Sequence, residues 1–415
     1  MQEVNSIKHS NFIPSGWKSQ KLIDFCINSK RAIVDGPFGS NLKSEHFREF
    51  GIPVINSSFV TDFSFKADKY VYVDEELFLR EIRSKVEPGD IIMAKIGARC
   101  GSTAIMPVNH PISILSGNSL KISINTDENV TDFVWYILAD LYQKNQMKDY
   151  KSVGAQPSIS TPLLKEMKIL RPPKIEQQKI AEILSTWDKA IELCQKTIEE
   201  LRSRNKGLAQ QLLSGRKKVK GFEDSEWSFV RFKEIYEPHK KLAQEIQYEI
   251  LSVTKSGIVS QSEYFNRNVA SENTSNYLVV ERGDFLVSGL NFWMGSYDVL
   301  DNFEIGIISP AYKVYRLKSG YSNQFFKHFV HGVQMRFAMI SASVVGASIV
   351  RRNFDLEALY EYAFKIPNFE EQKAIAKILD AAASELKHYE EKLNNLKLQK
   401  KGLMQQLLTG KVRTI

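Results

Sequence analysis

The chain contains two copies of one long segment, separated by 195 positions. Residues 206–217 are KGLAQQLLSGRK and residues 401–411 are KGLMQQLLTGK, and the correspondence extends without a gap for more than forty residues. Glu176-Gln177 corresponds to Glu371-Gln372, and Gly215 corresponds to Gly410. This period far exceeds the roughly 20–50 residues of solenoid repeats. The chain is therefore expected to consist of two large repeated halves.

Each copy predicts one long helix with a narrow apolar seam. Prolines precede both copies, and no further Gly or Pro follows until Gly207 and Gly402. Apolar residues then recur in alternating steps of three and four through five heptads, a pattern typical of a coiled coil rather than of an ordinary surface helix. The predicted seam consists of Ile180, Leu184, Trp187, Ile191, Ile198, Leu201, Leu208 and Leu212 in the first copy, and of Ile375, Leu379, Leu386, Tyr389, Leu393, Leu396, Leu403 and Leu407 in the second.

A single narrow seam requires a partner helix. The nearest candidate is the other copy, and a two-fold relation between the copies predicts an antiparallel intramolecular coiled coil. Pairing with another chain is the alternative. The polar seam positions Asn205 and Lys400 would fix the register or reach solvent. Gly207 and Gly402 each cost about 1 kcal/mol relative to Ala within a helix, which indicates either close approach of another backbone or a break in the rod.

The segments between the helices predict two globular domains of the α/β (α+β) class. GDIIMAKIGARCGS from Gly89 parallels GDFLVSGLNFWMGS from Gly283, a turn that enters an apolar strand. GAQPSI at Gly154 parallels GASI at Gly346. The predicted order is a domain at 1–172, a long helix at 173–220, a second domain at 221–367 and a second long helix at 368–415.

The charge of the chain is unevenly distributed. The net charge is +8 with a pI near 9.0, and residues 176–220 and 371–415 each carry a net +4. Residues 221–370 carry a net −3. An excess of this size is compatible with phosphate binding and equally with a merely soluble protein.

No motif of a catalytic site is present. The sequence lacks a G-x-x-x-x-G-K-[ST] loop, an N-P-P-Y motif, an F-x-G-x-G motif and a Pro-Asp dipeptide of a nuclease site. His328 and His331 stand alone and are expected to be ordinary surface or core histidines. We therefore expect a non-catalytic protein without a cofactor and without a metal.

The cysteines and the N-terminal residues indicate the compartment. Cys26, Cys100 and Cys194 are odd in number and far apart, which suits core residues in a reducing cytosol. The first residues lack the apolar stretch of a signal peptide, and no apolar run approaches the ~20 residues that span a bilayer. We expect a cytoplasmic protein with no membrane association.

Over nearly its whole length, the sequence resembles the specificity subunit of type I restriction-modification enzymes. The resemblance rests on Gly16-Trp17, on DGPFGSNLK from Asp35, on GDIIMAKIG, on GAQPSIS leading into PPKIEQQKIAEIL, and on the paired GL-x-QQLL-[ST]-G-[RK] helix ends. The alternation of variable domain and conserved helix is specific to that family.

The resemblance implies a function. Residues 1–172 and 221–367 would be target-recognition domains, each similar to the recognition domain of a DNA adenine methyltransferase. Each would recognise one part of an interrupted, asymmetric sequence in double-stranded DNA. The helices would dock two modification (methyltransferase) subunits, and restriction subunits with the motor and nuclease would join them. A helix of about 57 Å would act as a ruler between two major-groove contacts roughly one turn of ~34 Å apart.

Side chains beside the paired loops are the candidate DNA contacts. They are Lys43, Lys95, Arg99, Lys151 and Gln156 in the first domain, and Asn291, Arg336, Arg351 and Arg352 in the second. For each of them, a solvated basic or polar side chain is the alternative. Two other functions remain open, a coiled-coil scaffold that binds proteins and a free-standing DNA-binding regulator.

Overall fold

The chain forms two compact units. The computed structural model describes residues 13–37, 39–61, 63–152, 156–244, 248–265, 274–348 and 351–414. The first unit consists of residues 1–193 and 393–415, and the second of residues 194–392. Each unit therefore combines one globular domain with one part of each long helix.

The first domain is built around two four-stranded sheets. One has the strand order β6-β3-β10-β7 and the other the order β2-β11-β8-β9, and β1 pairs with β14 in a separate two-stranded ribbon. The main strands are β1 (Lys18–Lys21), β2 (Ile33–Asp35), β3 (Ile52–Ile55), β6 (Tyr72–Val73), β7 (Lys85–Val86), β8 (Ile91–Ala94), β9 (Thr103–Ile105), β10 (Ser113–Leu115), β11 (Ser119–Ile122) and β14 (Lys168–Arg171). Two short hairpins add β4 (Val60–Thr61), β5 (Ser64–Phe65), β12 (Lys151–Ser152) and β13 (Ser158–Ile159).

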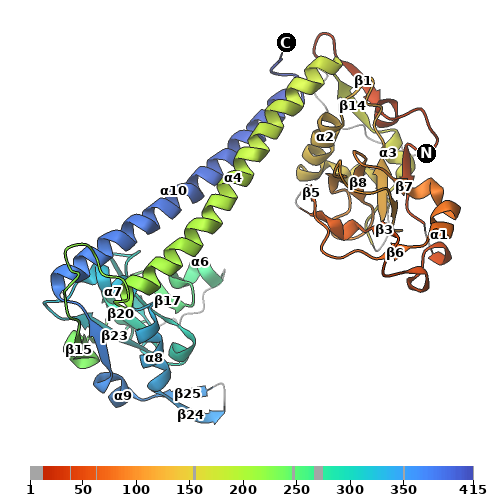
Figure 1. Cartoon of the computed structure of the whole chain (residues 1–415). Helices are drawn as coiled ribbons and strands as arrows, with labels where there is room; N and C mark the ends of the chain where they lie inside the picture. Colours follow the sequence, from red (N-terminus) through yellow and green to blue (C-terminus); the bar gives the residue numbers. More distant parts are fainter. Residues whose placement is uncertain are drawn as a thin grey trace. The chain divides into compact units, whose positions relative to one another are not determined.

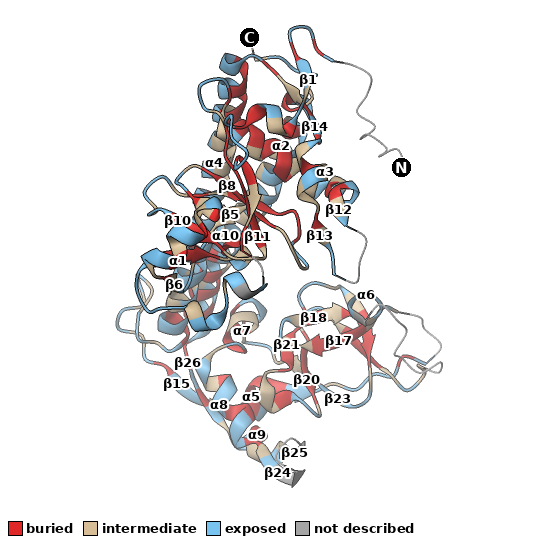
Figure 2. Cartoon of the chain, turned by 90° about the vertical axis from the view of Figure 1, so that its right-hand side faces the viewer, coloured by how far each residue is buried: buried red, intermediate tan, exposed pale blue. Residues whose placement is uncertain are grey.

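Helices cover the first domain and complete its core. They are α1 (Glu75–Arg80), α2 (Thr131–Gln143) and α3 (Thr161–Lys165). The central strands β8 and β11 are fully buried, and Figure 2 shows buried residues gathered along them. Apolar residues of α2, among them Phe133 and Leu138, pack in the same core.

The second domain repeats this architecture with different loops. Its sheets have the orders β16-β23-β20-β21 and β18-β17-β22-β19, and β15 pairs with β26. The strands are β15 (Ser228–Arg231), β16 (Tyr236–Pro238), β17 (Ile250–Thr254), β18 (Gly257–Ser260), β19 (Leu278–Glu281), β20 (Phe285–Ser288), β21 (Tyr297–Val299), β22 (Ile305–Ile308), β23 (Tyr312–Leu317), β24 (Ser343–Ser348), β25 (Arg351–Phe354) and β26 (Ala363–Ile366). The helices are α5 (Phe232–Ile235), α6 (Gln261–Phe265), α7 (Asn323–Phe329), α8 (Val333–Ser341) and α9 (Leu356–Glu361).

The predicted Gly-Asp turns enter corresponding strands in both domains. Gly89 and Gly283 have φ angles of +87° and +96°, a conformation that glycine adopts without steric cost. Asp90 and Asp284 each accept a backbone N–H three residues upstream, at 2.9 and 2.8 Å. The strands β8 and β20 follow directly, which confirms this part of the predicted repeat.

The two long helices are α4 (Lys174–Leu213) and α10 (Phe369–Leu407), and they pack side by side (Figure 1). In the second unit, the Arg204 Nη2 donates to the Glu385 carboxylate at 2.6 Å, and the Arg202 Nη2 donates to Glu390 at 2.6 Å. In the first unit, Lys400 pairs with Asp188. As the residue number increases along α4, the number of its partner on α10 decreases, so the two helices run in opposite directions. The predicted antiparallel intramolecular pairing is therefore confirmed.

The predicted seam positions are buried or half-buried along both helices. At the helix ends, however, these side chains enter the domain cores. Ile180 and Leu184 of α4 join the core of the first domain together with Leu407 of α10. Ile375 and Leu379 of α10 join the core of the second domain together with Leu212 of α4. Each domain is therefore held by the beginning of one helix and the end of the other.

The polar and glycine positions of the helices have distinct environments. The Asn205 amide donates to the Ala382 carbonyl at 2.8 Å, and the Lys400 ammonium pairs with Asp188. At Gly207 and Gly402, a Cβ would meet no described atom within 4 Å, and both helices continue without a break. Neither explanation offered for these glycines, a close backbone approach or a break in the rod, therefore applies within the described chain.

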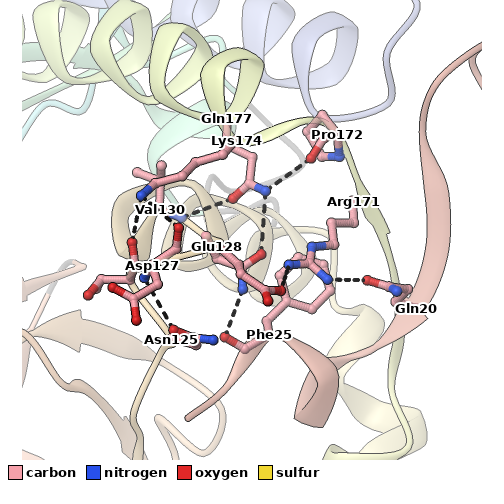
Figure 3. Close-up of polar contacts among 12 residues, drawn as sticks. Gln20, Phe25, Asn125, Asp127, Glu128, Val130, Arg171, Pro172, Lys174 and Gln177 are labelled. Carbon is pink, nitrogen blue, oxygen red and sulfur yellow. Dashed lines mark hydrogen bonds and ion pairs between the residues drawn. The ribbon is translucent and has the colours of Figure 1, made fainter.

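A glutamine near the start of each long helix binds it to its domain, and Figure 3 shows the one on α4, Gln177. The Gln177 side chain accepts from the Val130 N–H and donates to the Pro172 carbonyl, both at 3.0 Å. Gln372 accepts from the Ser322 N–H at 3.0 Å and donates to the Pro367 carbonyl at 2.9 Å. The duplicated glutamine thus has the same anchoring role in both halves.

The first domain adds ionic contacts at the same junction. The Arg171 guanidinium donates to Glu128 at 2.7 Å and to the Gln20 side chain at 2.9 Å (Figure 3). The Lys174 ammonium donates to the backbone carbonyls of Thr126 and Asp127 at 2.8 and 3.0 Å. Lys174 thus ties the first turn of α4 to the loop before α2, and Arg171 ties the end of β14 to the same loop and to β1.

The described residues include no helix that is both long and apolar enough to span a membrane. Cys26, Cys100 and Cys194 are free thiols in buried positions. Burial raises the pKa of the Cys26 thiol to about 12, so this residue behaves as a small core side chain.

Candidate nucleic-acid interface

Three loops of the first domain meet beyond the ends of β2 and β8. The Ile159 N–H donates to the Lys95 carbonyl at 2.9 Å, and the Gly97 N–H donates to the Pro157 carbonyl at 3.2 Å. These bonds join the loop after β8 to the loop between β12 and β13. The loop after β2 begins against the neighbouring turn between β10 and β11, because a Cβ on Gly36 would lie 1.9 Å from the Ser116 carbonyl oxygen.

The Asp35 cluster, made of Asp35, Lys95 and Thr161, joins these segments through side chains. The Lys95 Nζ donates to Asp35 Oδ2 at 2.7 Å, and the Thr161 Oγ1 donates to Asp35 Oδ1 at 2.6 Å. The side chains of Lys95 and Asp35 are only 12% and 21% exposed. Lys95 is therefore paired and largely buried, unlike the open basic side chain expected of a direct DNA contact.

The other candidates of the first domain have more open positions. Arg99 is exposed, and its Nη1 donates to the Val60 carbonyl at 3.1 Å. Lys151 is half-buried at the start of β12, and Gln156 is exposed beside Pro157. Lys43 is exposed beside a 3₁₀ turn and lies 3.6 Å from the Glu45 carboxylate. The structure brings Lys95, Arg99, Lys151 and Gln156 onto the two joined loops.

The second domain joins its corresponding loops by ring contacts. The 3₁₀ helix η7 (Phe292–Met294) follows β20, and the Phe292 ring stacks on Phe354 of β25 with centroids 4.0 Å apart. The Arg352 guanidinium carbon lies 4.7 Å from the Trp293 ring centroid, and its Nη1 donates to Ser343 Oγ at 2.9 Å. Within the described ranges, neither Trp293 Nε1 nor Arg352 Nε meets an acceptor.

The remaining candidates of the second domain lie around η7. Asn291 is exposed at the start of η7, where its backbone N–H donates to Ser288 Oγ at 3.2 Å. Arg336 is exposed on α8, which packs against η7. The backbone of Arg351 belongs to β25, but its side chain lies outside the described part of the chain. Gly154 of the first G-A motif lies outside the described residues too.

Sequence patterns missed three residues that organise these loops. Asp35 and Thr161 lie 126 positions apart, and no local spacing signals their contact with Lys95. The available signal for Asp35 was its position as the first residue of the DGPFGSNLK motif. The third residue is Trp293, which follows the strand after the Gly-Asp turn. Its aromatic side chain was the available signal, because an arginine such as Arg352 stacks preferentially on Trp. The structure holds these loops together in each domain by different means.

The comparisons with known proteins agree with this architecture. Residues 14–203 match a family model described as a type I restriction modification DNA specificity domain. The putative type I restriction enzyme MjaX specificity subunit of Methanocaldococcus jannaschii is 26% identical over 420 residues, covering 97% of this chain and 95% of the relative. The MjaVIII specificity subunit of the same organism is 21% identical over 435 residues, covering 98% and 95%.

Solved structures share the fold. The type I restriction-modification S subunit from M. genitalium matches with a TM-score of 0.53 at 15% identity, covering 97% of this chain and 98% of that one. The HsdS subunit from Thermoanaerobacter tengcongensis matches with a TM-score of 0.53 at 14% identity, covering 97% and 99%. The family model over residues 14–203, the relatives aligned along nearly their whole length and the common fold make this chain similar to the specificity subunits of type I restriction-modification enzymes.

Proposed function

We propose that the chain is a specificity subunit of a type I restriction-modification enzyme, which recognises an asymmetric, two-part DNA target and docks two modification subunits, through which restriction subunits join. It would carry no catalytic site of its own, and no cofactor. One observation supports the proposal that the chain recognises DNA. The two domains have the same arrangement of strands and helices, but the loops on it differ in sequence and in the contacts that join them. A shared framework with different loops is what two unlike half-sites require.

The chemistry of the loops supports DNA recognition. Arg99, Lys151 and Gln156 on the first domain offer donors to phosphate oxygens and base edges, and Asn291, Arg336 and Arg352 do so on the second. Contacts to phosphates orient a protein on the duplex, whereas contacts to base edges supply sequence preference. The two sets differ in residue type and position, so the two half-sites are expected to differ.

The docking of two partners is supported by a set of exposed residues that are identical in the two copies of the long helix. We call them the repeat faces: Lys206, Gly207, Gln210 and Gln211 on α4, and Lys401, Gly402, Gln405 and Gln406 on α10. Their long side chains are exposed in both copies and make no side-chain hydrogen bond to any described residue. In contrast, residues 185–200 and 380–395 share no identical pair. Packing within the chain does not account for this identity, whereas two equivalent partners would.

A hollow beside α4 extends the first repeat face. It has a volume of about 360 Å³ and lies between the end of α4 and the turn that leads into α8. Lys206 and Gln210 line it on one side, and His331, Val333 and Arg336 on the other. Val333 and Phe337 of α8 are more than half exposed nearby. A modification subunit that covers the repeat face would also bury this surface, and Arg336 would then contact that subunit rather than DNA.

The recognition half is tested by mapping methylated adenines at base resolution in a host with and without this gene. We expect one motif, made of two parts with a fixed gap, to disappear with the gene. Identical maps in cells that express the chain and its neighbouring methyltransferase would overturn the proposal and favour a protein-binding scaffold. Tight sequence-specific binding without any methyltransferase would instead favour a free-standing regulator.

The docking half is tested by the stoichiometry of the purified complex. The variant K206E/Q210A should retain one modification subunit, and so should K401E/Q405A, whereas the combination should retain none. The control Q195A/K196E changes exposed residues of α4 outside the repeat face and should retain two. Two bound subunits in every variant, measured by native mass spectrometry, would exclude the repeat faces as docking sites.

A further inference from the structure

The Asp35 cluster holds three separate segments of the first domain together through one carboxylate. Both oxygens of a single carboxylate are used, one by Lys95 and one by Thr161, at 2.7 and 2.6 Å. The three residues come from the end of β2, the residue after β8 and the first residue of α3. Asp35 and Lys95 directly precede candidate recognition loops, at residues 36–43 and 96–101, and Thr161 lies just after β13, which ends the third, at residues 152–158. A single carboxylate therefore sets the spacing of three loops.

The backbone of Lys95 reinforces the same junction. Its N–H donates to the Asn118 carbonyl at 2.9 Å, and its carbonyl accepts from the Ile159 N–H at 2.9 Å and from the Cys100 Sγ at 3.0 Å. With the ammonium on Asp35, every polar group of this residue points into the protein. A phosphate contact by Lys95 would require breaking a largely buried ion pair, which leaves a carboxylate uncompensated.

Among its described residues, the second domain has no counterpart to this cluster. Gly289 occupies the position after β20 that Lys95 occupies after β8. A Cβ at Gly289 would lie 2.3 Å from the Ala311 carbonyl oxygen, so no side chain fits there. The ring contacts of Phe292 and Trp293 join the corresponding segments instead. Disrupting the Asp35 cluster should therefore affect one half-site only.

We infer that Asp35, Lys95 and Thr161 are positioning residues for the first half-site, which fix three recognition loops relative to one another without touching DNA. The inference rests on the proposed recognition function. It also revises the expectation that Lys95 contacts DNA directly. The alternative, a phosphate contact by Lys95, makes a different prediction for K95M and for T161V.

The test uses the complex with its modification subunits and duplexes that carry the two-part motif or a single-base change in either half. D35N, K95M and D35N/K95M should each lower discrimination at the first half-site by about an order of magnitude, the size of one lost base preference. Discrimination at the second half-site should not change. The double variant should resemble either single variant, because all three remove one shared interaction.

The salt dependence of binding separates positioning from a phosphate contact. Each lost phosphate contact reduces the slope of log K against log salt by about 0.9, and weakens all sequences alike. K95M should leave this slope unchanged. A reduced slope with intact discrimination would show that Lys95 contacts DNA, and the positioning role would be wrong.

Conservative variants keep the test decisive if the charge changes impair folding. T161S retains the hydroxyl donor to Asp35 and should behave as wild type, whereas T161V should lose discrimination at the first half-site. K21M removes an exposed ion pair with Glu166 (2.6 Å) in the same domain and serves as the matched control. If the wild-type complex recognises no two-part motif, the proposed function fails. If it does and all Asp35-cluster variants discriminate normally, only this inference fails.

Discussion

The guanidinium of Arg413, beyond the end of α10, donates hydrogen bonds to both carboxylate oxygens of Glu176 in the first turn of α4. The distances are 2.7 Å from Nε to Oε1 and 2.9 Å from Nη2 to Oε2. The Trp17 indole N–H donates to the same carboxylate at 2.9 Å. In the second unit, Glu371 accepts from the Trp227 indole at 3.0 Å and lies 3.6 Å from the Lys218 Nζ. A buried carboxylate between a tryptophan and a base thus recurs in both halves.

Replacing Arg413 should destabilise the first unit. R413M removes the charged partner of a fully buried carboxylate, which then keeps an uncompensated charge. We expect a lower thermal midpoint for the first unit, measured by differential scanning calorimetry. E176Q/R413M should recover part of the loss, because the charge is removed with its partner. An unchanged midpoint in R413M would contradict the role given to this pair.

Acid should weaken the first unit through Glu176. Burial raises the pKa of this carboxyl, but the hydrogen bonds from Arg413 and Trp17 outweigh it, so the pKa lies below the ordinary value of 4.5. A carboxyl with a lowered folded-state pKa stabilises the fold above its unfolded pKa, and this stability is lost as the pH falls through the folded pKa. The wild type should therefore lose more stability than E176Q below about pH 4.5. E182Q, at an exposed site of the same helix, is the control for denaturation followed across this range.

Alanine at the helix glycines should stabilise the free subunit. A Cβ at Gly207 or Gly402 meets no described atom within 4 Å, so only the helix propensity changes. Each of G207A and G402A should raise the free energy of unfolding by about 0.5–1 kcal/mol, measured by urea denaturation. G215A should do the opposite, since Gly215 has a φ of +71° and faces the Trp227 ring. If a partner backbone approaches the repeat faces, the same alanines should weaken its binding.

Arg352 should matter for the second half-site through its planar shape. R352K keeps the charge but loses the guanidinium plane over Trp293 and the geometry of the bond to Ser343. We expect about tenfold weaker discrimination at the second half-site, as for one lost base preference, with the first half-site unchanged. The measurement is competition binding with singly changed duplexes. Equal loss at both half-sites would indicate a general phosphate contact instead.

The helix pair should set the length of the unread gap. Cys194 Sγ lies 3.5 Å from the Tyr389 carbonyl oxygen, so these residues mark the same level of the two helices. Inserting one heptad after each of them keeps the seam in register and lengthens both helices by about 10.5 Å. The gap in the methylated motif should then grow by about three base pairs at ~3.4 Å each, with both half-sites unchanged. An insertion in only one helix should disrupt the pairing, and an unchanged gap would contradict the ruler.

The long helices could be predicted because their pattern is local and redundant. Each seam position is supported by neighbours three and four residues away, and the second copy repeats the pattern. Antiparallel pairing followed from the duplication alone. The entry of Ile180 and Leu407 into one domain core did not, because an apolar seam residue has the same spacing whether it faces a helix or a domain.

The candidate site was less accessible from the sequence. Lys95 was predicted as a DNA contact from its place beside a loop, but its surroundings depend on Asp35, 60 positions upstream. A lysine held by a buried carboxylate and a lysine open to solvent look alike in a sequence. From the sequence, Gly207 and Gly402 indicated either close packing within the chain or a break in the helix. In the structure neither glycine packs closely against described residues, so a reason for them has to be sought in a partner at the outer surface of the helices.

The division of the helices between the units also has a consequence during synthesis. The core of the first domain contains Met404, Leu407 and Leu408, which lie more than 190 residues beyond Leu184 in the same core. At ~5–20 residues per second, a ribosome takes about 10–40 s to make the intervening chain. Through that interval, Ile180 and Leu184 of the nascent first domain lack the apolar side chains of α10 that pack in the same core. The order of translation therefore leaves the core of this domain incomplete until the final helix emerges, and faster elongation shortens that interval.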